Sequence, residues 1–158
     1  MATVLDLNEL FEREEAEDRE DREDREDREE LSEPQATLEF LRRKGFEAWT
    51  DNDGDIVFRD DEGRTYLYTA SHTDRQYHRI LFPSFWRIDS MEECVAAQRC
   101  AAEVTTEIKV AKVFVRGDAV WASIGLFCLP AENFRLVFDR SMGALRASVQ
   151  GFKTKMWS

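Results

Sequence analysis

The chain has 158 residues, which is enough for one domain with a buried core. Its formal net charge is −11, and residues 12–30 account for most of it, with 13 acidic and 5 basic side chains. Because phosphate binding needs a basic stripe and none is visible, we expect no nucleic-acid partner. We expect neither a transmembrane helix nor a signal peptide, since no long apolar run and no basic segment before one is present.

Residues 1–31 are expected to form a separate acidic arm. Residues 18–29 repeat Asp-Arg-Glu four times. On a helix this repeat places opposite charges four positions apart, and each pair stabilises the helix by about 0.2–0.5 kcal/mol. The same residues lack an apolar face, which is equally typical of a disordered, solubilising segment. The arm is therefore either a solvated helix or disordered, and neither interpretation implies chemistry.

A folded domain is expected over residues 32–158, beginning with a short helix. Ser32 and Gln35 have the spacing of a capping box, and Gly45 is a typical stop at the end of a helix. Extended segments separated by turns rich in Asp and Gly should follow. We expect Pro83 to end the last of them. These segments are residues 46–50, 56–59, 65–69 and 77–82.

Two longer helices are expected in the second half of the chain. Ser90 and Glu93 form a capping box that opens the first, whose apolar positions include Met91 and Val95. The second should start near Pro130, because apolar residues then recur at steps of three and four. That stripe is Phe134, Val137, Phe138, Met142, Leu145, Val149, Phe152 and Met156.

Residues 110–129, between these helices, predict a β-hairpin. Gly117 and Asp118 suit a two-residue type II′ turn, because glycine adopts the positive φ that the first turn position needs. This turn sets a register in which Phe114 faces Trp121. Alternation along both strands then produces one wholly apolar side, which we expect to face the core. It consists of Ala111, Val113, Val115, Val120, Ala122, Ile124, Leu126 and Cys128.

The other side of this hairpin carries three aromatic residues that a half-solvated strand does not need in order to fold. We interpret it as a partner-binding or dimer surface. An aromatic pair across two strands also stabilises a sheet by about 0.2–1 kcal/mol, so a purely structural role stays open. Gly125 is expected to leave room there for another molecule to approach. The proposed surface residues are Lys112, Phe114, Arg116, Trp121 and Phe127.

The expected order is helix, three or four strands, helix, two strands, helix. This order predicts an α+β domain with an antiparallel sheet and helices packed on one face. Residues 80–90, 110–115 and 120–124, followed by a Phe-rich helix, resemble YbjN-like proteins, which are related in fold to type III secretion chaperones. The resemblance covers about residues 34–156. It implies a non-enzymatic, often homodimeric domain that binds polypeptide or acts as a regulator.

Candidate chemistry is sparse in this sequence. Residues 51–55 with Glu62 faintly match a calcium loop, but Ile56 stands where such a loop requires glycine, so a hairpin turn is the better interpretation. His72 and His78 are interpreted as loop or surface histidines, because no further ligand lies at zinc spacing. We expect no metal, no cofactor and no catalytic residues.

The three cysteines indicate in which cellular compartment the protein is located. Cys94, Cys100 and Cys128 are an odd number and lie on expected regular elements. This is typical of reduced thiols that act as small buried hydrophobes, so we expect a cytoplasmic protein without a redox pair.

Two classes of function stay open. The first is a protein-interaction domain that binds another polypeptide and itself as a homodimer. The alternative is a small-ligand-binding module, or an uncharacterised enzyme, with a pocket between sheet and helices that uses polar residues of segment 71–79. The aromatic surface and the missing catalytic set favour the first class.

Overall fold

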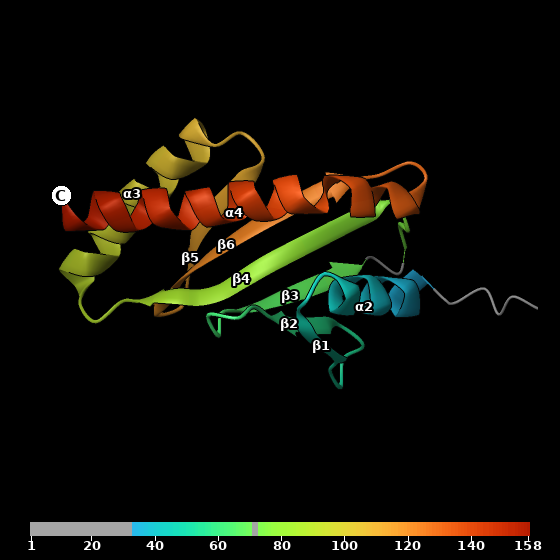
Figure 1. Cartoon of the computed structure of the whole chain (residues 1–158). Coiled ribbons are helices and arrows are strands. Elements are labelled where there is room, and N and C mark those ends of the chain that lie inside the picture. The colour runs from blue at the N-terminus through green and yellow to red at the C-terminus, as the bar shows by residue number, and fades with distance from the viewer. Residues whose placement is uncertain (1–32, 71–72) are drawn as a thin grey trace, which may run out of the picture. The chain divides into compact units, whose positions relative to one another are not determined.

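The computed structural model describes residues 33–70 and 73–158, which form a six-stranded sheet and three α-helices (Figure 1). The predictions for residues 1–31 lie outside the described residues, as do Ser32 and His72. In chain order the elements are α2 (Glu33–Arg43), β1 (Glu47–Thr50), β2 (Ile56–Arg59), β3 (Thr65–Ala70), β4 (Tyr77–Arg87), α3 (Met91–Glu107), β5 (Ala111–Arg116), β6 (Ala119–Phe127), a short 3-10 helix (Ala131–Asn133) and α4 (Phe134–Trp157).

All strands of the sheet pair antiparallel, in the order β1-β2-β3-β4-β6-β5. The order of the strands in the sheet follows their order in the chain except at one edge, where β6 lies between β4 and β5. The edges of the sheet are therefore β1 and β5. This arrangement confirms the predicted α+β class and the antiparallel sheet.

Two hairpin turns of the sheet use an aspartate in the same way. The Asp51 Oδ1 atom accepts hydrogen bonds from the backbone N–H groups of residues 53 and 55, at 2.9 and 3.0 Å. Asp60 Oδ1 accepts from residues 62 and 64, at 3.1 and 2.9 Å. These carboxylates satisfy backbone donors of their own turns, as Asp does in tight turns. Within the described residues, no group of three or more His, Cys, Asp or Glu side chains is placed to hold a metal ion.

The register of the β5–β6 hairpin is the predicted one. Phe114 pairs with Trp121, and Arg116 pairs with Ala119 next to the turn. Gly117 has a φ of 62°, the positive value that the first position of a type II′ turn requires. The turn therefore determines which side chains face the core.

The prediction that Pro83 ends its strand is wrong. β4 continues to Arg87, and its pairing with β6 shifts between Phe82 and Trp86. Ser84, inside this irregularity, has a φ of 50°. A bulge leaves the ladder locally unpaired, so a proline that cannot donate a hydrogen bond is tolerated there.

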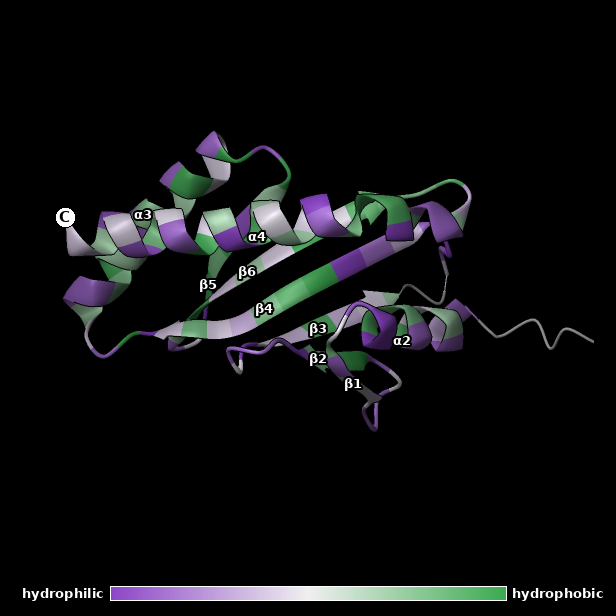
Figure 2. Cartoon of the chain, viewed as in Figure 1, coloured by the Kyte–Doolittle hydropathy of each residue, from purple (hydrophilic) through white to green (hydrophobic). Residues whose placement is uncertain are grey.

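The helices pack on one face of the sheet, and α3 and α4 lie side by side over it (Figure 1). Figure 2 shows that the middle of β4 is hydrophobic while its first part is hydrophilic. The predicted stripe of α4 is confirmed, with Phe138, Leu145 and Phe152 almost fully buried, although Val137 is 38% exposed.

The predicted stripe of α3 is partly wrong. Met91 and Val95 are 79% and 62% exposed, whereas Ala101, which the helical spacing also predicted, is buried together with three residues outside the predicted stripe. Small side chains let the helix approach the sheet and α4 closely. These residues are Ala97, Cys100, Ala101 and Val104.

Candidate binding face of the sheet

The side of the sheet that points away from the helices, here called the outer face, carries a row of side chains across all six strands. Directly paired residues of antiparallel strands point to the same side, so the registers define this row. It runs from the β1 edge to the β5 edge as Trp49, Val57, Leu67, Leu81, Ser123 and Lys112. Four of its six members are apolar, and they belong to strands that the sequence separates widely.

The predicted aromatic pair lies beside this row on the same face. Phe114 and Trp121 are paired across β5 and β6 and are half-buried, although none of the three described helices covers them. The Arg116 guanidinium lies over the Trp121 ring at 4.7 Å from its centre, and Arg59 lies over Trp49 at 5.3 Å. Each tryptophan of the outer face is therefore covered by an arginine in a cation–π contact.

The expectation that Gly125 leaves open space is wrong. A Cβ atom at Gly125 would lie 2.6 Å from the Tyr77 hydroxyl, so the Tyr77 side chain already occupies that space. Tyr77 is paired with Phe127, and their ring centres are 5.2 Å apart. Phe127 itself is 76% exposed, which leaves it at the end of the outer face as an aromatic contact for solvent or a partner.

Basic side chains are anchored on the outer face by cross-strand threonines. Arg59 Nε donates to Thr65 Oγ1 at 3.4 Å, and Arg79 Nε donates to Thr69 Oγ1 at 3.2 Å. Each arginine is paired directly with its threonine, so the same geometry occurs twice. Such bonds hold the guanidinium groups in place while part of each fork stays available for another acceptor.

The edges of the sheet are closed by side chains. At the β5 edge, Thr105 Oγ1 accepts from the Val113 N–H at 3.0 Å and lies 3.3 Å from the Val113 carbonyl oxygen, to which it is placed to donate. At the β1 edge, Arg42 donates two hydrogen bonds, of 3.1 and 2.9 Å, to the Ala48 carbonyl. Because strand addition needs free backbone groups at an edge, these contacts block it at the middle of both edge strands.

His78 does not lie at the surface, contrary to the sequence interpretation. It lies on β4 on the helix-facing side, is 1% exposed and stacks on Phe134 at 4.7 Å between ring centres. Its Nδ1 atom shares a 2.6 Å hydrogen bond with the Tyr68 hydroxyl. Burial, and then the charge of Arg135, lower the pKa of His78, while burial raises the pKa of Tyr68 to about 12. Both groups are therefore uncharged near neutral pH.

Space between the sheet and the helices is filled by side chains. Phe58, Tyr66 and Phe138 are each at most 1% exposed and contact one another in a cluster of aromatic rings. A shallow depression in the described part of the chain lies elsewhere, on α3, and is lined by Ala102, Glu103, Thr106 and Glu107.

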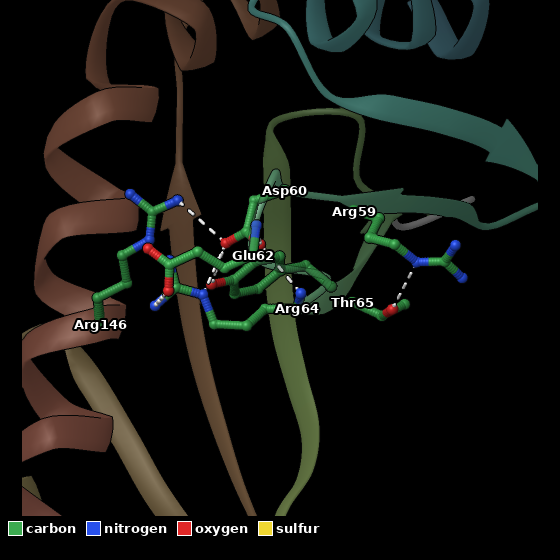
Figure 3. Close-up of polar contacts among 7 residues, drawn as sticks. Arg59, Asp60, Glu62, Arg64, Thr65 and Arg146 are labelled. Carbon is green, nitrogen blue, oxygen red and sulfur yellow. Dashed lines mark hydrogen bonds and ion pairs between the residues drawn. The ribbon is translucent and has the colours of Figure 1, made fainter.

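A buried carboxylate connects the β2–β3 turn to α4 (Figure 3). Asp60 Oδ2 accepts from Arg64 Nε at 2.7 Å, and Arg146 of α4 lies 3.8 Å away. Burial alone would raise the pKa of Asp60, but hydrogen bonds from Arg64 outweigh it and hold the pKa below its usual value. This cluster fixes the turn against the helix and is satisfied internally, so we assign it a structural role.

Cys94, Cys100 and Cys128 form no disulfide, and burial raises the pKa of the Cys128 thiol. The Cys128 thiol is therefore protonated and poorly nucleophilic at neutral pH. Among the described residues, no helix is both long and apolar enough to cross a membrane.

Sequence reasoning found the β5–β6 part of the outer face but missed its continuation. Trp49, Leu67 and Arg79 were within predicted strands, and their alternation with buried neighbours was a usable signal. What the sequence lacked was the strand order that places them on the same face of one sheet as Trp121. No protein-family model matches this chain, and no curated protein matches it.

Proposed function

We propose that this chain is a non-enzymatic protein-interaction domain that binds a partner polypeptide through its outer face. The observation that carries the proposal is the outer face itself, on which apolar residues of β1 to β4 and the aromatic pair of β5 and β6 lie without a described helix over them. Tryptophan, tyrosine and arginine, which dominate the energy of many protein interfaces, are concentrated there. Phe114, Trp121, Phe127, Lys112 and Arg116 remain the proposed contact residues at the β5–β6 end.

The packing of the helix side supports this proposal over the alternative. A ligand-binding module or enzyme would need a concave site with convergent polar groups. The corresponding interior holds Leu145 and Phe152, both fully buried, and the buried His78 is used in a hydrogen bond to Tyr68. The resemblance to YbjN-like proteins and secretion chaperones points in the same direction and stays a prediction. We also expect a cytoplasmic location, in keeping with three free thiols.

Site-specific photo-crosslinking tests the proposal. A benzophenone amino acid is placed at Phe114 on the outer face, and in a matched variant at Gln98, an exposed position of α3. After irradiation in native cells, we expect a discrete protein adduct from position 114 and none from position 98. Adducts from both positions, or from neither, would contradict the proposal.

The double variant Phe114→Ala/Trp121→Ala provides the second measurement. Circular dichroism should show a folded domain, because both side chains lie outside the core. Because Phe114 is replaced in this variant, the benzophenone amino acid is placed at Leu67 instead. We expect the crosslinked adduct from position 67 to be lost in the double variant. Sedimentation velocity of the wild type and the double variant tests the predicted homodimer, which should dissociate if its contact lies on the outer face.

A further inference from the structure

We infer that the partner segment bound by the outer face is an acidic polypeptide that also carries apolar side chains. This inference rests on the proposed function and adds the chemistry of the partner. Residues 33–158 are nearly neutral, with 18 acidic and 17 basic side chains. The paired strand positions of the outer face instead hold a single acidic residue, Glu47, and five basic ones. The basic residues are Arg59, Arg79, Arg87, Lys112 and Arg116.

Three of these cations have no carboxylate partner among the described residues. Arg59 lies 3.5 Å from Glu47, and Arg87 lies 3.6 Å from Asp89. Arg79, in contrast, bonds only to a threonine, and neither Lys112 nor Arg116 forms an ion pair with a described residue. Lys112 ends the row at the β5 edge, and Arg79 and Arg116 lie beside the row, so the outer face combines apolar side chains with a basic rim. A segment with apolar side chains and carboxylates complements both parts.

The geometry disfavours a second copy of this chain as the occupant. A two-fold contact would place the outer face against itself and bring the same cations together. Like charges facing each other across an interface oppose association. Strand addition is disfavoured as well, because Thr105 and Arg42 occupy backbone groups at both edges. The partner segment should therefore lie across the face.

A nucleic acid fits this face less well than an acidic polypeptide. Single-stranded nucleic acids stack their bases on open aromatic rings. Here Arg116 and Arg59 already cover Trp121 and Trp49. Three free cations are also few for a phosphate backbone, and the aliphatic residues Val57, Leu67 and Leu81 suit apolar side chains better than bases.

Fluorescence anisotropy with three labelled peptides tests the inference on the full chain. Each peptide has twelve residues, of which four are Leu and four are Ser. The remaining four residues are all Glu in the first peptide, all Gln in the second and all Lys in the third. At low ionic strength we expect the Glu peptide to bind roughly tenfold more tightly than the Gln peptide, as several partly exposed ion pairs together allow. The advantage should shrink with added salt, and the Lys peptide should bind most weakly.

Two double variants show which cations produce the preference for the Glu peptide. Lys112→Gln/Arg116→Gln should remove most of the preference for Glu over Gln, whereas Arg99→Gln/Arg140→Gln, the same charge change on exposed helix positions, should leave it intact. Equal binding of the Glu and Gln peptides overturns the inference. If both peptides then lose affinity in Phe114→Ala/Trp121→Ala, the proposed function survives without the acidic preference.

Absence of binding by every peptide overturns the inference too, while the crosslinking result decides the proposed function separately. A labelled twelve-nucleotide oligo-dT is included as the competing class. Binding of this oligonucleotide that Lys112→Gln/Arg116→Gln abolishes would assign the basic rim to nucleic acid and overturn the inference.

Discussion

Thr105→Val removes the hydroxyl group that closes the β5 edge while keeping nearly the same side-chain shape. In the wild type, Thr105 Oγ1 accepts from the Val113 N–H at 3.0 Å and is 3.3 Å from its carbonyl oxygen. Valine offers neither an acceptor nor a donor. The variant therefore leaves both backbone groups of Val113 without a partner at a position that is 5% exposed.

The cost follows from these contacts. Leaving a buried polar group unsatisfied costs about 1–3 kcal/mol, and water at a sheet edge can restore part of the lost hydrogen bonding. We expect Thr105→Val to lower the free energy of unfolding by roughly 1–2 kcal/mol. The exposed edge should also promote concentration-dependent association through strand pairing.

Urea denaturation followed by circular dichroism measures the stability, and sedimentation velocity at increasing concentration measures the association. Thr106→Val is the matched control, because Thr106 Oγ1 donates only to the Ala102 carbonyl of the same helix, at 2.9 Å. Thr105→Ser should retain most of the wild-type stability. If Thr105→Val is as stable and as monodisperse as Thr106→Val, the edge is not closed by this hydroxyl and the reasoning fails.

Phe138→Ala should lower the free energy of unfolding by roughly 3–5 kcal/mol, because this 1% exposed ring packs against rings of α2, β2 and α4; near-native stability in urea would show that it is not core. Asp60→Ala should cost about 2–3 kcal/mol and Asp60→Asn clearly less, since the amide oxygen can still accept from the turn N–H groups; equal melting temperatures of the two variants would contradict this. Because burial lowers the pKa of His78 below its ordinary 6.5, the unfolded state binds the extra proton first, and the free energy of unfolding should fall as the pH drops below about 6.5. His78→Gln should reduce that slope below about pH 6.5 in urea titrations, and an unchanged slope would assign it to other groups.

The aromatic residues of the domain fall into two groups, one in the core under the helices and one on the outer face. Phe58 and Phe138 are buried under the helices, whereas Trp49 and Trp121 lie on the outer face with arginines over them. Ala119 and Ser123 on the outer face are only 7% exposed, although no helix among the described residues covers them.

Local patterns in the sequence determined the elements whose geometry depends on near neighbours. Gly117 set the turn, and the turn set the β5–β6 register, because two-residue loops allow few alternatives. The period of α4 identified Phe138, Leu145 and Phe152 as core, since a long helix exposes one consistent face to the sheet. Ser90 likewise caps α3 as its spacing to Glu93 predicted.

Only the tertiary structure decided the extent of the outer face and the closing of its edges. Alternation assigns side chains to two sides of one strand, but the order of strands brings Leu67 beside Leu81 and Leu81 beside Ser123. The bulge after Phe82 depends on the pairing of β4 with β6. The burial of His78 and the position of the Tyr77 side chain over Gly125 also depend on this pairing. These features arise from contacts between residues far apart in the chain, where packing and hydrogen-bond satisfaction outweigh local preference.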